Sequence, residues 1–291
     1  MGQREPLLGI AIGRKGVGKT YETLDIITQT LKGTVGGAKP RKVLILDVNN
    51  EFATVRQDHK NPRFPDIKAI SLSRIKEFTH SPTIEARRVT VYKDKSVGGG
   101  KMSLKDTQAA LGIILENYQG GLLVIEDINK FISDSLPNDL IGSIITQRHV
   151  SVDVITHFQS IGKAAHPKLW ANCNYLRFHK CDDTVERHKS KFGGPVEHLK
   201  ILEKMVDIEY EKGNKRFFAY LDKDNGNVKG PFNRTLFRHA IEGYLTDNYG
   251  IVTKEINRKH LHSGKAVHPS HQSAVKYLIN GLEKRYYGNQ V

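Results

Sequence analysis

The sequence predicts an α/β fold, in which helices cover both faces of a mostly parallel sheet. Short apolar runs typical of buried strands alternate with segments that place apolar residues on one helical face. The first apolar run ends in a glycine-rich loop, and a later one ends in two adjacent acidic residues. Alternation of strands and helices favours a parallel sheet, because each crossover between parallel strands needs a helix-length connection.

The expected elements follow from this pattern in chain order. Strands are expected at residues 7–12, 43–46, 122–125, 152–156 and 175–179, with a possible strand around 89–91. Helices are expected after the glycine-rich loop, from about 103 to 117, and from Pro137 onward, where apolar residues share a face. Much of the region between residues 53 and 100 has a less regular pattern, so its structure is not predicted in detail.

The pattern changes after about residue 186. Two apolar runs, at 217–221 and 228–232, flank Asn225-Gly226, which is a strong signal for a hairpin turn. From Asp247 onward the chain is basic and polar and contains one short amphipathic helix. We therefore expect three parts, namely a core at 1–185, an extension with a β-hairpin and helix at 186–246, and a basic tail at 247–291.

Composition indicates a soluble globular protein of the cytoplasm. Of the 291 residues, 38% are apolar and 26% are charged, and no apolar run is long enough to cross a membrane. The N-terminus lacks the apolar segment of a signal peptide, and Cys173 and Cys181 are too few for a disulfide framework. The formal net charge of +14 favours a polyanionic partner such as nucleic acid, although a merely soluble basic surface would have the same charge.

Residues 13–20 fit the phosphate-binding pattern G-x-x-x-x-G-K-[ST] and lie between an apolar strand and a helix. Glycines let the backbone wrap phosphate groups, while amide N–H groups and the helix N-terminus supply partial positive charge. Lys19 is expected to neutralise the β- and γ-phosphate oxygens, and Thr20 to bind Mg²⁺. The sequence thus predicts that ATP and Mg²⁺ are bound by Gly13, Arg14, Lys15, Gly16, Val17, Gly18, Lys19 and Thr20.

Glu126 and Asp127 directly follow the apolar strand at 122–125. One carboxylate would hold Mg²⁺, partly through water, and the other would orient the attacking water. In the usual order Asp precedes Glu, so here Glu126 would take the metal role and the shorter Asp127 the water role. Alternatively, Asp127 serves the metal and Glu51 handles the water, and the sequence leaves both assignments open.

The strand at 152–156 is followed by two candidate γ-phosphate sensors, Gln159 and His157. A polar side chain at this point would lie beside the acidic pair, because neighbouring parallel strands end at the same edge of a sheet. Either residue could instead cap the helix that follows.

Together these residues resemble the FtsK–HerA superfamily of DNA-pumping ATPases. The resemblance rests on the P-loop strand, Asp47-Val-Asn-Asn-Glu51-Phe, the strand ending in Glu126-Asp127, the segment that begins at Arg148, and Gln159. It covers about residues 5–185. The small size is similar to that of viral genome-packaging ATPases and of the ATPase domain of Zot-like phage assembly proteins. Zot-like proteins ordinarily have a membrane span after that domain, which favours the packaging branch.

The resemblance implies a RecA-like P-loop NTPase core in a homo-oligomeric ring, with a hexamer favoured and double-stranded DNA in the centre. It implies that Arg148 reaches the nucleotide of the neighbouring subunit, with Arg177 as second candidate, although Arg148 could equally complement a helix dipole. Lys93, Lys95 and Lys101 flank a triple glycine and are candidates for DNA contact. A viral protein of this kind would act in the host cytoplasm or virion, and its tail could dock on capsid or vertex proteins.

Three functions are consistent with these expectations. The favoured one is an ATP-driven double-stranded DNA translocase used in viral genome packaging. A P-loop kinase for a small molecule is the second, and the paired carboxylates argue against it. The third is an assembly or DNA-binding switch whose docking is gated by nucleotide.

Overall fold

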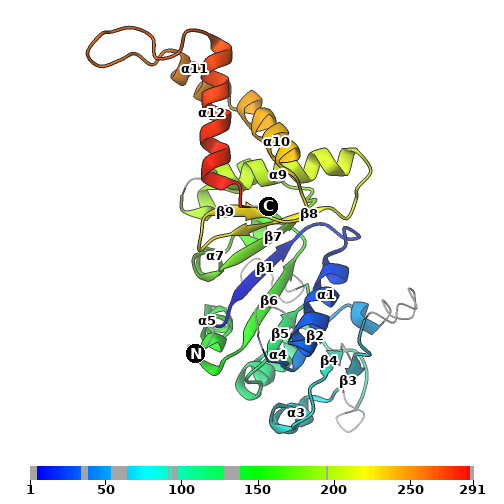
Figure 1. The fold of residues 1–291 in the computed structure, drawn as a ribbon. Coiled ribbons are helices and arrows are strands. Elements are labelled where there is room, and N and C mark those ends of the chain that lie inside the picture. Colours follow the sequence, from blue (N-terminus) through cyan, green and yellow to red (C-terminus); the bar gives the residue numbers. More distant parts are fainter. Residues whose placement is uncertain are drawn as a thin grey trace.

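The computed structural model describes residues 5–33, 39–53, 64–90, 92–93, 98–127, 138–194 and 196–288. Within them, a nine-stranded sheet has the order β3-β4-β2-β5-β6-β1-β7-β8-β9 (Figure 1). The strands are β1 (Leu8–Ile12), β2 (Val43–Asp47), β3 (Lys68–Ala69), β4 (Ala86–Thr90), β5 (Leu122–Ile125), β6 (Asp153–Phe158), β7 (Tyr175–His179), β8 (Phe218–Asp222) and β9 (Asn227–Lys229). Strands β1 to β7 pair in parallel, and β8 and β9 are antiparallel.

Helices connect most of these strands. In chain order they are α1 (Lys19–Lys32), α3 (Ile75–His80), α4 (Leu104–Asn117), α5 (Asn138–Thr146), α6 (Ile161–Ala164), α7 (Pro167–Asn172), α8 (Val185–His188), α9 (Glu197–Glu211), α10 (Arg234–Asp247), α11 (Tyr249–Ile256) and α12 (His271–Tyr286). Short 3₁₀ turns occur at η1 (Leu72–Arg74), η4 (Gln147–Val150) and η5 (Lys189–Phe192). The helix expected from Pro137 is α5, and Pro137 itself lies outside the described residues.

Apolar side chains of the central strands divide between two cores, one on each face of the sheet. Successive residues of a strand point to opposite faces. Accordingly Leu44 of β2 belongs to the larger core, together with residues of α4 and α5, whereas Ile45 belongs to the smaller core with residues of α1. The strands β1, β2, β5 and β6 are buried along their whole length, as expected where helices cover both faces. The predicted α/β fold with a P-loop core is confirmed.

The C-terminal part of the chain continues the same sheet. Strand β8 pairs antiparallel with β7, and the hairpin to β9 turns at Asn225-Gly226, where Gly226 has a φ of 68°. Helices α10, α11 and α12 then form an arm beyond this edge of the sheet (Figure 1). The amphipathic helix expected in the tail is α12. In the part of the chain that the structure describes, no helix is long and apolar enough to cross a membrane.

A buried ion pair holds the turn that follows β2. The carboxylate of Asp47, which is fully buried, accepts hydrogen bonds from Arg88 Nη1 at 3.2 Å and from the backbone N–H of Glu51 at 2.9 Å. Arg88, from the neighbouring strand β4, also donates to Asn50 Oδ1 at 2.6 Å. Asn50 has a φ of 59°, a left-handed conformation that Asn tolerates better than most residues. These contacts fix the direction in which Glu51 leaves the turn.

Arg88→Met is expected to destabilise the fold by about 3 kcal/mol, because it leaves the buried Asp47 carboxylate without its charged partner. The free energy of unfolding, measured by denaturant titration, checks this. The matched control is Arg87→Met on the same strand, since Arg87 forms a partly exposed pair with Glu85 at 2.8 Å. That control should cost less than about 1 kcal/mol. Equal losses in the two variants would contradict the structural role of the Asp47–Arg88 pair.

Candidate active site

The glycine-rich loop joins β1 to α1, as predicted, and its conformation depends on glycine. Gly13 has a φ of 151° and Gly18 a φ of 90°, which residues with a side chain rarely adopt. A Cβ atom on Gly13 would lie 2.6 Å from Cβ of His179, so a larger residue would displace the neighbouring strand. The loop can therefore follow this path only with the glycines of the phosphate-binding pattern.

Lys19 is folded back over the loop. Its Nζ donates to the backbone oxygens of Gly13 and, at 2.8 Å, of Arg14. Burial lowers the pKa of Lys19, and the negative charges of Glu51 and Asp127 oppose this effect. The ammonium group is thus held inside the curve of the loop, where phosphate oxygens could replace the carbonyl oxygens as its partners.

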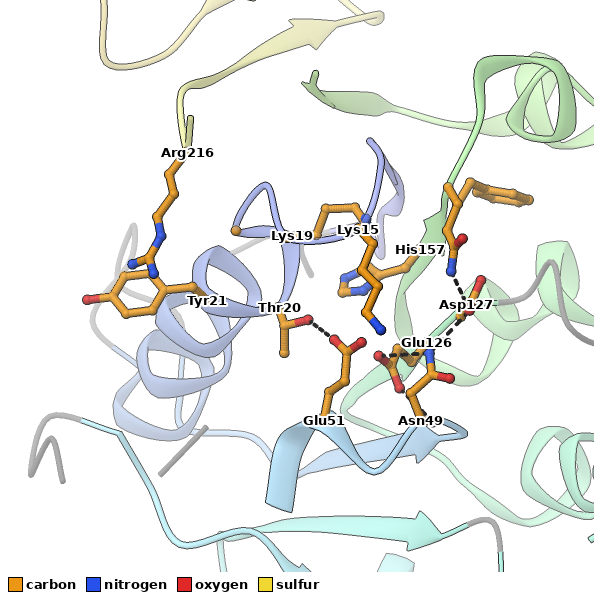
Figure 2. A pocket seen from close by; sticks show the side chains of 14 residues that line it. Lys15, Lys19, Thr20, Tyr21, Asn49, Glu51, Glu126, Asp127, His157 and Arg216 are labelled. Atoms are coloured by element: carbon orange, nitrogen blue, oxygen red, sulfur yellow. Dashed lines mark hydrogen bonds between the residues drawn. The ribbon is translucent and has the colours of Figure 1, made fainter. Parts of the chain in front are cut away.

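Thr20 contacts the acidic residue of the motif that follows β2. Its hydroxyl donates to Glu51 Oε2 at 2.7 Å (Figure 2). The sequence assigns Thr20 to Mg²⁺, and a carboxylate and a hydroxyl are both oxygen ligands of the kind this ion prefers. Glu51 therefore lies beside the hydroxyl that the sequence assigns to Mg²⁺.

Glu126 and Asp127 lie together at the end of β5 and share one amide donor. The side chain of Asn49 donates to Glu126 Oε1 at 3.4 Å and to Asp127 Oδ2 at 3.2 Å, and its backbone N–H donates to Glu126 Oε2 at 3.2 Å. Gln159 also donates to Asp127 Oδ2, at 2.6 Å. The other oxygen of Asp127, Oδ1, is buried and has no hydrogen-bond partner among the described residues. Among the described residues, Asp127 is thus held through Oδ2 alone.

One pocket collects the loop and the acids. Its lining includes Lys15, Lys19, Thr20, Glu51, Glu126 and Asp127. The residues that the sequence predicts for phosphate, for metal and for water therefore converge in space. Their individual roles in a reaction remain predictions.

Burial, together with neighbouring acidic groups, favours the protonated form of Glu126. Burial, and then repulsion from Glu51 and Asp47, raises the pKa of Glu126 to about 10. Burial also raises the pKa of Asp47, although Arg88 opposes the shift. At neutral pH Glu126 is consequently protonated.

This set of groups fits a divalent cation whose remaining ligands are phosphate oxygens. The side-chain atoms of Thr20 and Glu51 that could bind a metal are oxygens. Asp127 Oδ1 is a buried acceptor with no partner in the described part of the chain. No group of three or more acidic, histidine or cysteine side chains within the described ranges is arranged to hold a metal alone. Mg²⁺ is typically bound by one or two carboxylates together with substrate phosphates, so both observations suit Mg²⁺ with a nucleotide.

His157 and Arg177 belong to a buried polar network behind the loop. His157 Nε2 shares a hydrogen bond of 2.8 Å with Thr23 Oγ1, and Arg177 Nη2 donates to Thr23 Oγ1 at 2.6 Å and to Lys19 O at 2.9 Å. Burial lowers the pKa of His157 well below its usual value, so the imidazole is neutral. These residues hold the first turns of α1 against the sheet. Of the two sensor candidates, Gln159 is the one that contacts Asp127.

The prediction that Arg177 could reach a neighbouring subunit is wrong. Arg177 is only 1% exposed, and its guanidinium is bonded within its own chain. Arg148 falls in η4, but its side chain lies outside the described residues, so its action in trans stays a prediction. Lys95 also lies outside them. Lys93 pairs with Asp106 at 2.9 Å, and Lys101 is exposed.

Four residues that line the pocket were not predicted from the sequence, namely Asn49, Tyr21, Phe158 and Arg216. Asn49 could have been found, because it lies inside the Asp47-to-Glu51 motif and an amide suits a place between two acids. Tyr21 directly follows the P-loop but matches no position of its pattern. Arg216 lies far along the chain in a basic loop with no motif, so no sequence signal indicated it.

Glu126→Gln should stabilise the nucleotide-free protein by on the order of 2 kcal/mol at pH 8. The folded-state pKa of about 10 lies above the unfolded value, so the stability of the wild type falls as pH rises between those values, and Gln removes this dependence. Thermal unfolding at several pH values checks the difference, which should shrink toward pH 5. Glu116→Gln, at an exposed position, is the matched control. A difference that is independent of pH would contradict the protonation of Glu126.

Comparisons with known proteins give similarity in structure alone. No model of a known protein family matches the sequence, and no curated protein is similar to it in sequence. The genome packaging NTPase B204 from Sulfolobus turreted icosahedral virus 2, in complex with ATPγS, is 15% identical and has a TM-score of 0.47 over 78% of this chain and 97% of that one. B204, the DNA-packaging ATPase from Sulfolobus turreted icosahedral virus, is 12% identical, with a TM-score of 0.47 over 79% and 100%. The N-terminal domain of zonular occludens toxin from Neisseria meningitidis is 15% identical, with a TM-score of 0.32 over 64% and 91%.

Proposed function

We propose that this chain hydrolyses ATP with Mg²⁺ and uses the energy to move double-stranded DNA, with viral genome packaging as its use. One observation supports ATP hydrolysis above all. Lys19 and Thr20 line the same pocket as the acidic residues that follow β2 and β5. A phosphate-binding loop alone would suit many P-loop proteins. Carboxylates beside the loop add what hydrolysis needs, which is a metal ligand and a group that orients water.

The contacts favour one division of labour among the acids. Glu51 accepts a hydrogen bond from Thr20 and Glu126 lies between Glu51 and Asn49, so both belong to the metal side. Mg²⁺, when bound by Thr20 and Glu126, would neutralise charge on the phosphate oxygens. Asp127, whose Oδ2 accepts hydrogen bonds from Gln159 and Asn49, is then the acceptor for a proton of the attacking water. In the alternative assignment, Asp127 serves the metal and Glu51 the water.

The DNA part of the proposal rests on charge and on the motif resemblance. A formal net charge of +14 favours a polyanion through neutralisation of phosphates and release of counterions. The motif set resembles that of ring-forming DNA pumps, so we propose a homo-oligomeric ring, with a hexamer favoured. Arg148 is the proposed trans-acting residue of that ring.

Double-stranded DNA should stimulate ATP hydrolysis severalfold, because a translocase couples hydrolysis to movement along bound DNA. Phosphate release measured with and without DNA checks this.

Lys19→Ala should lower kcat/KM by at least about 100-fold, since it removes the cation that meets the transferred phosphate. An intact ATPase that is indifferent to DNA would count against translocation and favour the nucleotide-gated switch. Phosphorylation of a small molecule would favour the kinase.

Asp127→Asn should retain Mg²⁺-dependent ATP binding and lose about 100-fold or more in kcat, because Asn cannot accept the proton of water. Glu51→Gln should instead weaken Mg²⁺-dependent binding. Nucleotide titrations with and without Mg²⁺, together with single-turnover rates, separate the two effects. If Asp127→Asn abolished the Mg²⁺ dependence while Glu51→Gln stopped only the chemical step, the alternative assignment would hold.

A further inference from the structure

We propose that Arg216 and Tyr21 form the end of the nucleotide site that receives the α-phosphate and ribose, with Arg216 as a nucleotide-binding residue. Arg216 comes from the connection between α9 and β8, far from the P-loop in sequence. The inference rests on the nucleotide site proposed above and deepens it, because it assigns a ligand to a cation that no motif identifies.

The stem of Arg216 runs along the phosphate-binding loop. A Cβ atom on Gly18 would lie 3.4 Å from both Cβ and Cγ of Arg216, which is ordinary van der Waals contact. Beyond this point, the guanidinium carbon lies 5.5 Å from the centre of the Tyr21 ring. Tyr21 is itself braced by Phe64, whose ring meets it edge-on at 5.1 Å. The guanidinium is therefore held over the first turn of α1, at the border of the pocket.

The two ends of the pocket differ in chemistry. Asp127 and Gln159 lie together at one end, where hydrolysis requires the γ-phosphate and water. Arg216 and Tyr21 lie on the other side of Thr20 from Asp127 (Figure 2). A triphosphate that runs along the loop with its γ-phosphate at the acids must direct its α-phosphate and ribose toward the opposite end. That end is the one where the Arg216 guanidinium lies.

The charge of Arg216 is available to a ligand. Within the described ranges, the guanidinium of Arg216 pairs with no carboxylate, and it lies over the Tyr21 ring. Two other cations of this region are paired with carboxylates, Arg14 with Asp182 at 3.0 Å and Lys180 with Asp207 at 2.6 Å. A guanidinium offers several N–H donors in a plane and binds phosphate oxygens more strongly than neutral donors do. An unpaired guanidinium beside a phosphate-binding loop thus fits the α-phosphate.

The position of Arg216 predicts a distinct pattern of binding. The α-phosphate and ribose are common to ATP and ADP, so the two nucleotides should depend on Arg216 to the same extent. A residue that acted on the γ-phosphate would affect ATP alone, and a residue of the transition state would affect kcat. The pattern of losses therefore reports which part of the nucleotide Arg216 contacts.

The test measures Kd for ADP and for a nonhydrolysable ATP analogue in the full-length chain, by displacement of a fluorescent ADP. Arg216→Ala should weaken both about tenfold, the loss expected for one charge-assisted hydrogen bond. Arg216→Lys should recover part of the loss, and in steady state the KM for ATP should rise more than kcat falls. Lys215→Ala, at the adjacent exposed residue that does not line the pocket, is the matched control and should bind both nucleotides normally.

Three results would overturn the inference. They are unchanged ADP binding by Arg216→Ala, a loss confined to the ATP analogue, and an equal loss in the Lys215→Ala control. Arg216→Lys keeps the test valid if the alanine variant unfolds. Failure of the proposed translocase is distinguishable, because ATP hydrolysis that ignores DNA, with ADP binding that still depends on Arg216, would refute DNA movement and leave this assignment intact.

Discussion

Four carboxyl groups lie close together at the carboxyl edge of the sheet, on Asp47, Glu51, Glu126 and Asp127. Their combined negative charge constrains the rest of the site. Three of them are almost fully buried, so each charge loses hydration and repels its neighbours. The fold compensates part of this cost with Arg88 at Asp47, with the attraction of Lys19 to Glu51 and Asp127, and with neutral donors from Asn49 and Gln159. What remains is relieved by keeping a proton on Glu126, whose pKa is raised to about 10. A cation bound together with phosphates, as proposed above, would further reduce the repulsion among these acidic groups.

Residues of the C-terminal half of the chain contact the phosphate-binding loop on the side away from these acids. Strand β8 returns antiparallel to β7, which brings the end of α9 and the residues before β8 beside the loop. Arg14 of the loop pairs with Asp182 and contacts the hydroxyl and ring of Tyr210, a residue of α9. Arg216 lies along Gly18 from the same region. The loop and the C-terminal extension are therefore in direct contact.

Sequence patterns predicted the parts of the site that depend on local signals. The P-loop residues, the acids after β5 and Gln159 follow buried strands whose apolar runs are unambiguous, and parallel strands bring their ends together. Strand β4 was only partly predicted, because Arg87 and Arg88 interrupt its apolar pattern. Arg177 was misassigned since sequence does not distinguish a charged residue that is buried with partners, here Thr23 and the Lys19 carbonyl, from one that reaches outward. Arg216 was missed because its place depends on the return of β8 beside β7, a long-range arrangement without a local signature.

The most direct test of the central claim, that these acids and the loop form one Mg²⁺-nucleotide site, is a calorimetric titration with a nonhydrolysable ATP analogue. Titrations in two buffers of different ionisation enthalpy count the protons exchanged on binding. With Mg²⁺ present at neutral pH, the account predicts release of about one proton per site, because a carboxyl must lose its proton to bind metal. Without Mg²⁺, binding should be weaker and release smaller. Binding that is equally tight without Mg²⁺, and that exchanges no protons in either case, would contradict the account.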